Sequence, residues 1–158
     1  MLFVNQIAEI THSQVDKYGG SANKNIGDAF LLVWKFKREA DFSKKGNMHV
    51  SHENKVVADL ALFSFIKVIA KINKLTHILE YREDAALNAR MPGYKVKMGF
   101  GLHQGWAIEG AIGSFFKIDA SYLSPNVNMA SRLEAATKQY GVPLLISGAL
   151  HDIFSHEI

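Results

Sequence analysis

The sequence has no cysteine and only three prolines among its 158 residues. Without cysteine, disulfide scaffolds, thiol nucleophiles and zinc–thiolate sites are excluded. The scarcity of proline, together with 48% apolar and 21% charged residues, excludes collagen-like, mucin-like and disordered chains. We therefore expect residues 1–158 to form a single globular domain with a hydrophobic core.

Long hydrophobic runs are missing as well. The most apolar stretch, Val56 to Ile72, contains Asp59, Lys67 and Lys71 and is shorter than the roughly 20 apolar residues that a bilayer span needs. It predicts a buried helix and no membrane contact by this segment. No basic and apolar leader of the signal-peptide type opens the chain. We expect the domain in the cytoplasm, or at the cytoplasmic face of a membrane in a longer parent protein.

A strong charge of one sign is also absent. The net charge is +3, and the segment 35–55, with six basic and three acidic residues, accounts for it. A surface that binds nucleic acid would spread its basic residues over one face, with aromatic residues between them. We therefore expect no nucleic-acid partner and assign the basic charge to an exposed loop at about 35–54, which is long for a connection.

The spacing of the apolar residues predicts the first half of the fold. A helix is expected from Leu2 to the Gly19-Gly20 pair, and a hairpin of two short strands from Ser21 to Trp34, turning at Gly27-Asp28. After the charged loop, apolar residues at helical spacing predict a long helix from Asn54 to about Glu80.

The second half begins with a strand from Tyr94 to Leu102, which alternates apolar and polar residues. We expect Trp106 to Ile112 to be its partner in a second hairpin. Ser124, Pro125 and Gly141 mark the ends of the next helix. A strand at 144–146 and a short helical segment at 148–154 complete an α+β fold with an antiparallel sheet covered by helices.

Two pairs of residues could carry chemistry. Asp28 lies at the tip of the first hairpin, and Lys24 lies four residues before it; an acid in a turn often only satisfies local N–H groups, and a lysine in a strand is often a solvated edge charge. Asn128 and Arg132, four residues apart on a helix, lie side by side away from the apolar face. That arrangement suits a cleft, and it is also common in purely structural pairs.

Glycines and histidines elsewhere suggest no further site. Residues 99–105 (GFGLHQG) are superficially like a dinucleotide-binding loop, but the third glycine is one residue late and the glycines fall on a strand. His103 is expected to be a packed or hydrogen-bonded histidine of that strand. The other six histidines show no metal-ligand spacing.

Three segments in this order carry a family resemblance: residues 18–30 (YGGSANKNIGDAF), 99–105, and 117–134 (KIDASYLSPNVNMASRLE). Together they resemble the catalytic domain of class III nucleotidyl cyclases, which make cyclic AMP or cyclic GMP from the nucleoside triphosphate. The resemblance covers roughly residues 2–35 and 94–150. It implies the ferredoxin-like sheet of the nucleotide cyclase fold and a signalling enzyme.

The resemblance assigns a role to each candidate residue. Asp28 matches one of two aspartates that hold two Mg²⁺ or Mn²⁺ ions, and these ions activate the ribose 3′-oxygen for attack on the α-phosphorus. Asn128 matches the residue that orients the ribose. Arg132 matches the residue that stabilises negative charge on the α-phosphate.

The resemblance places base recognition at Lys24 and Ser121. A lysine donates to adenine N1 and a hydroxyl accepts from the exocyclic amine, whereas guanine presents N–H donors that a lysine cannot satisfy. ATP is therefore expected over GTP. A hydroxyl at Ser121 resembles the subgroup that includes the bicarbonate-responsive soluble adenylyl cyclases.

Two departures from the family pattern concern the ends of the chain. The first metal-binding aspartate belongs on a strand before the opening helix, and Asp16, at the end of that helix, cannot replace it. No lysine follows Lys138, although the family's triphosphate-binding lysine lies past the last strand. We therefore expect a cyclase domain truncated at both ends, whose second metal carboxylate lies upstream of Met1 and which is inactive alone.

The family works as a head-to-tail dimer, so a homodimer or a pairing with another cyclase domain is implied. Two other hypotheses stay open. One is a catalytically silent cyclase-like module that binds a nucleotide or a partner cyclase. The other is an RNA-binding or diguanylate-cyclase relative on a similar sheet; the paired aromatic residues and the Gly-Gly-Asp-Glu-Phe signature of such proteins are missing from the sequence.

Overall fold

The computed structural model describes residues 2–26, 29–37, 50–78, 98–115 and 117–155. Its helices and strands follow the chain in the order α1 (Leu2–Lys17), β1 (Ser21–Ile26), β2 (Ala29–Val33), α2 (His52–Ile78), β3 (Phe100–Leu102), β4 (Ile108–Ser114), β5 (Lys117–Leu123), α4 (Pro125–Tyr140), β6 (Leu144–Ile146) and α5 (Gly148–His151). The α+β class is confirmed.

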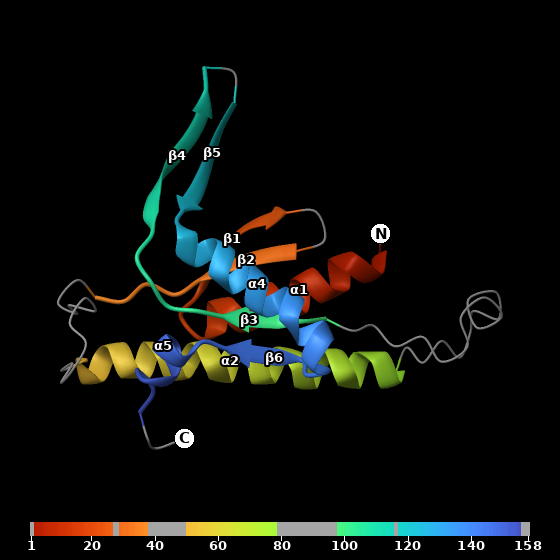
Figure 1. Ribbon diagram of the computed structural model, residues 1–158. Helices are drawn as coiled ribbons and strands as arrows, with labels where there is room; N and C mark the ends of the chain where they lie inside the picture. Colours follow the sequence, from red (N-terminus) through yellow and green to blue (C-terminus); the bar gives the residue numbers. More distant parts are fainter. Residues whose placement is uncertain (1, 27–28, 38–49, 79–97, 116, 156–158) are drawn as a thin grey trace.

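The strands form three pairs. β1 and β2 are antiparallel, and so are β4 and β5, whereas β3 and β6 run parallel. The long helix α2 lies along one side of the β3–β6 pair, and α4 crosses on the other side (Figure 1). The β4–β5 hairpin projects away from these layers as an arm, which Figure 1 shows plainly.

The core forms where α1 and α2 meet the β3–β6 pair. The ring of Phe65 on α2 contacts both Trp34, just beyond β2, and Phe100 on β3, with ring centroids 5.5 and 5.4 Å apart. Val68 and Ile153 are completely buried in the same cluster. Apolar residues at helical spacing on α2 therefore face the core, as the sequence predicts.

The stem of the charged segment is held against α2. Asn54 is fully buried, and its side-chain oxygen accepts a 2.8 Å hydrogen bond from the backbone N–H of Lys37. Of the predicted loop at 35–54, residues 38–49 lie outside the described part of the chain, and residues 52–54 already belong to α2.

The predicted second hairpin is wrong. Trp106 to Ile112 does not return along β3; β4 pairs with β5, for which the sequence predicted no strand, and β3 pairs with β6. The first part of the predicted strand, residues 94–97, lies outside the described residues. After β3 the chain passes against α4, with Gly105 in contact with the side chain of Asn126, rather than turning back.

The ends of α4 agree with the prediction. The side chain of Ser124 accepts a hydrogen bond from the N–H of Asn126, Pro125 occupies the first turn, and Gly141 adopts the left-handed conformation (φ 66°) that a glycine tolerates without strain. Among the described helices, none combines the length and the apolar character needed to cross a membrane.

Candidate functional site

The structure places Lys24 and Ser121 on neighbouring hairpins. Lys24 is half-buried on β1 opposite Leu31, and Ser121 lies on β5 opposite Gly110, with 7% of its surface exposed. Between these hairpins, the side-chain N–H of Asn23 donates to the carbonyl oxygen of Ala120 over 3.5 Å. The residues adjacent to Lys24 and Ser121 are therefore in direct contact.

An irregularity in β1 accompanies this contact. The register of the β1–β2 pair shifts between Ala22 and Lys24, so Asn23 is an extra residue in the ladder. A bulge of this kind redirects side chains and is frequent beside binding sites. Here it directs the Asn23 amide toward β5 and leaves its buried oxygen without a partner within the described residues.

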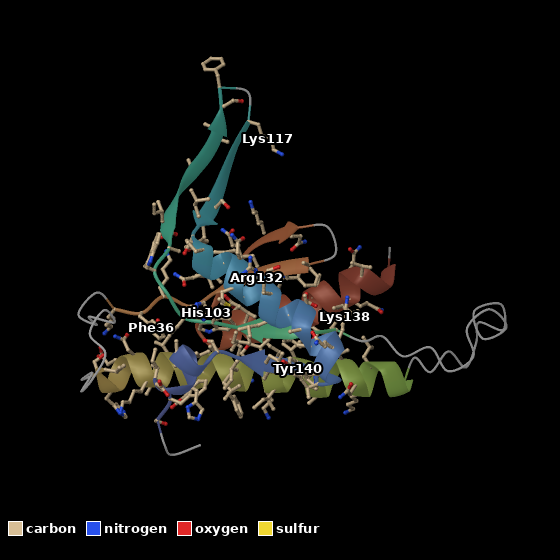
Figure 2. The ribbon with its side chains drawn as sticks, in the orientation of Figure 1. Phe36, His103, Lys117, Arg132, Lys138 and Tyr140 are labelled. Carbon is tan, nitrogen blue, oxygen red and sulfur yellow. The ribbon has the colours of Figure 1, made fainter. Side chains whose placement is uncertain are left out.

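Asn128 and Arg132 lie one turn apart on the exposed side of α4. Figure 2 shows Arg132 in the middle of this helix and Lys138 in its last turn. Since α4 begins directly after β5, one continuous segment carries Ser121, Asn128 and Arg132. Four side chains form no hydrogen bond or ion pair with any described residue: Lys24, Ser121, Asn128 and Arg132.

The start of α4 is fixed by His103. Its Nδ1 lies 2.8 Å from the Ser147 hydroxyl and its Nε2 lies 3.0 Å from Oδ1 of Asn126. The Asn126 amide N–H in turn donates to the carbonyl of Trp106 over 2.8 Å. His103 thus joins the end of β3 to α4 and α5; the prediction of a hydrogen-bonded histidine is confirmed, and the residue lies one position beyond the strand.

Asp28, the predicted metal ligand, lies outside the described residues. The strands on either side of it pair up to Ile26 and Ala29. In the remainder of the chain that the structure describes, no three histidine or acidic side chains gather as a metal site would require. Metal binding therefore remains a prediction from the sequence.

Sequence reasoning missed a charged network beside the site. Both carboxylate oxygens of Glu109 lie 2.7 Å from Nζ of Lys35, and the hydroxyl of Tyr122 donates to the same carboxylate over 2.9 Å. The hydrogen bond from Lys35 and then that from Tyr122 lower the pKa of Glu109 below its usual 4.5. Glu109 and Lys35 are 74 residues apart, so no local sequence pattern could have predicted this contact.

Comparison with known proteins places this geometry in a family. Residues 1–154 match the family model described as the adenylate and guanylate cyclase catalytic domain. An adenylate cyclase from Anabaena cylindrica is 27% identical over 146 residues, which cover 92% of this chain and 24% of that protein. The chain therefore spans about a quarter of the length of this relative.

Solved structures of cyclases share the fold of this chain. A bacterial light-regulated adenylyl cyclase superposes with a TM-score of 0.75 at 26% identity, covering 99% of this chain and 38% of the other. The adenylyl cyclase CyaB from P. aeruginosa gives a TM-score of 0.68 at 20% identity, covering 95% of this chain and 65% of the other, and shows the shared fold. The chain belongs to the adenylate and guanylate cyclase catalytic domain family.

Proposed function

We propose that this domain forms 3′,5′-cyclic AMP and pyrophosphate from ATP. In this reaction the ribose 3′-oxygen loses its proton and bonds to the α-phosphorus, and the bond from the α-phosphorus to the bridging oxygen of the β-phosphate breaks. The observation that carries the proposal is the Asn23–Ala120 contact, which holds the hairpins of Lys24 and Ser121 together beside the helix of Asn128 and Arg132.

Base choice follows from hydrogen-bond chemistry at Lys24 and Ser121. The ammonium group can donate to N1 of adenine, and the largely buried hydroxyl can accept from the exocyclic amine. Guanine carries an N–H at N1, which would face the ammonium group as donor against donor. Leaving such polar groups unpaired in a desolvated site costs about 1–3 kcal/mol each, so ATP is favoured over GTP.

The α4 side chains supply ribose and phosphate contacts. Asn128 offers both a donor and an acceptor to the ribose hydroxyls. Arg132, one turn later, presents a planar set of N–H donors that suits the charge spread over the phosphate oxygens in the transition state. Their exposure in the single chain fits a site that is completed by a second protomer.

Of the residues of this chain, we assign only Asp28 to the binding of divalent metal ions. A carboxylate oxygen suits Mg²⁺ or Mn²⁺, and the family pattern pairs it with a second aspartate. Bound ions of this kind would offset the triphosphate charge and favour the deprotonated 3′-oxygen.

The exposed apolar residues support a dimer. Phe115 at the arm is 96% exposed, and large apolar side chains on the arm, its approach and α1 are also open to solvent, namely Trp106, Ile108, Ile118, Leu123 and Val4. Contiguous exposed apolar surface marks an interaction site in soluble proteins. A two-fold homodimer would bring acids from one protomer to the base, ribose and phosphate residues of its partner, and would create two equivalent sites.

The second candidate function is a silent cyclase-like module that binds a nucleotide or pairs with an active cyclase. It stays open because one of the family's two metal-binding aspartates, Asp28, is matched within this chain. Such a module would keep nucleotide binding at Lys24 and Ser121 without turnover.

Activity assays separate the two candidates. The purified chain should form cyclic AMP from ATP and Mn²⁺ at a rate indistinguishable from background, whereas a version extended by the flanking coding sequence should turn over, with ATP preferred. An extended version that carries an upstream aspartate and still shows no product would favour the silent module. Robust turnover by the chain alone would show that its own residues suffice for catalysis.

A further inference from the structure

The charged network around Glu109 connects two parts of the fold that otherwise touch little. Lys35 lies just beyond β2, while Glu109 and Tyr122 face each other across the base of the β4–β5 arm. Among the described residues, two polar side-chain contacts join the β1–β2 segment to the arm: Asn23 with Ala120 and Lys35 with Glu109. We call the second, with Tyr122, the arm latch.

The latch lies at the base of the arm, where a small change in angle displaces the tip by a larger distance. Each arm strand has seven residues and is therefore about 20 Å long, and Lys117 lies near its distant tip (Figure 2). A small rotation at the base moves the whole arm. At the same base, Tyr122 is the immediate neighbour of Ser121, and Lys35 follows the strand that pairs with Lys24.

We propose that Glu109 is a positioning residue that holds the base of the arm against β2 and so sets Ser121 at its working position relative to Lys24. This inference rests on the proposed role of these two residues in base recognition. The latch itself makes no contact with substrate in this scheme. It acts by restricting the angle between the two hairpins.

The strength of the latch should depend on salt concentration. Lys35 and Glu109 are exposed over 60% and 53% of their side chains, so salt weakens their attraction. The Tyr122 hydroxyl adds a third group to the cluster, and its ring is held on β5, so the carboxylate has a fixed anchor on the arm itself. Increasing salt should therefore loosen the arm before it unfolds the domain.

The test uses the absence of cysteine. Ala111→Cys on the arm and Asn73→Cys on α2, both at exposed positions, accept spin labels without any background thiol. Electron-spin distance measurements then report the arm angle, and NMR titrations of the unlabelled chain with ATP and with GTP report the ratio of their dissociation constants.

The test variant is Glu109→Gln, which removes the charge of the side chain and keeps its shape. The matched control is Glu53→Gln, because Glu53 forms an equally exposed 2.6 Å pair with Lys37 away from the arm.

We expect Glu109→Gln to broaden the distance distribution and to reduce the preference for ATP by about two- to fivefold, the scale of an exposed ion pair. Glu53→Gln should change neither. The exchanged pair Lys35→Glu with Glu109→Lys should restore both values toward those of the unaltered chain.

An unchanged distance distribution, an unchanged base preference in Glu109→Gln, or a failed rescue by the exchanged pair would each overturn the positioning role. If the unaltered chain binds neither nucleotide, the proposed function fails. The distance measurement then still decides: a distribution that Glu109→Gln leaves unchanged overturns the latch, and one that it broadens and the exchanged pair restores supports the latch as a restraint on the arm.

Discussion

Gly101 of β3 lies directly beneath the backbone of α4, so close that a Cβ atom there would overlap the carbonyl oxygen of Ala130. The neighbouring Gly99 has the same relation to the Thr137 hydroxyl. These glycines let α4 approach the strand, and α4 carries Asn128 and Arg132. The glycine pair that superficially looks like a dinucleotide loop is therefore a helix-packing surface.

Gly101→Ala should destabilise the domain, because backbone atoms of α4 cannot move aside as a flexible side chain could. We expect a loss of about 1–3 kcal/mol, typical of overpacking, measured by urea unfolding. Gly110→Ala is the matched control: nothing lies within 4 Å of a Cβ at Gly110, so it should be close to neutral. Equal stability of the two variants would contradict the close approach of α4 to β3.

Local signals predicted some elements well and others poorly. The N-cap at Ser124, Pro125 and the left-handed Gly141 define α4 by chemistry within the segment, and the prediction is confirmed. The strand predicted at 106–112 overlaps β4, but its partner β5 was missed because apolar residues of β5 such as Ile118 are exposed and do not follow the alternation of a half-buried strand. Pairing of β3 with β6 depends on residues more than 40 positions apart, which no local pattern records.

The candidate site was predicted in the same uneven way. Lys24, Ser121, Asn128 and Arg132 come from family motifs; the structure places them on β1, β5 and α4, and their roles stay predictions. The supporting contacts were not predicted, because the bulge at Asn23 and the ion pair at Glu109 exist only once distant strands meet.

Exchanging the base-recognition pair should change nucleotide preference. Lys24→Glu with Ser121→Cys replaces a donor by a carboxylate that accepts from the guanine N–H groups. In an extended, active version we expect the ratio of kcat/KM for ATP over GTP to fall well below that of the unaltered protein. The single Lys138→Glu variant, far along α4, controls for the charge change. A ratio that does not move would count heavily against base recognition at these positions.

Removing the Arg132 guanidinium should slow the chemical step. In the extended, active version, Arg132→Ala is expected to reduce kcat by about 10²–10³-fold with little change in KM, as for the loss of one transition-state donor. Lys138→Ala, two turns later on the same exposed helix, should retain activity. If Arg132→Ala instead raised KM alone, the side chain would bind ground-state substrate and the proposed role would be wrong.

The arm should be needed for self-association. Ile118→Ser removes an apolar side chain that is 69% exposed, so it should cost the folded monomer little while weakening a dimer. Sedimentation velocity of the chain over a range of concentrations would measure the shift toward monomer. Ile66→Ser on α2, also exposed but far from the arm, is the control. A dimer that survives Ile118→Ser and dissociates with Ile66→Ser would move the interface to α2.

The charge state of Glu109 predicts how the arm latch depends on pH. Hydrogen bonds from Lys35 and Tyr122 lower the pKa of Glu109 below 4.5, and the Glu109 hydrogen bond raises the pKa of Lys35 above 10.5. A lowered carboxyl pKa contributes stability that is complete above the unfolded-state pKa and is lost as pH falls through the folded-state pKa; a raised lysine pKa contributes stability that is lost as pH rises through it. The latch should therefore hold between roughly pH 5 and 10 and open in acid.

Carboxyl carbon NMR can follow Glu109 directly. We expect its pKa to lie below the ordinary 4.5 of a glutamate, and to rise when Lys35→Met removes the ammonium group. As a control, Lys37→Met removes the partner of Glu53 and should leave the pKa of Glu109 unchanged. If Lys35→Met does not raise the pKa of Glu109, the ion pair does not persist in solution, and it cannot hold the base of the arm.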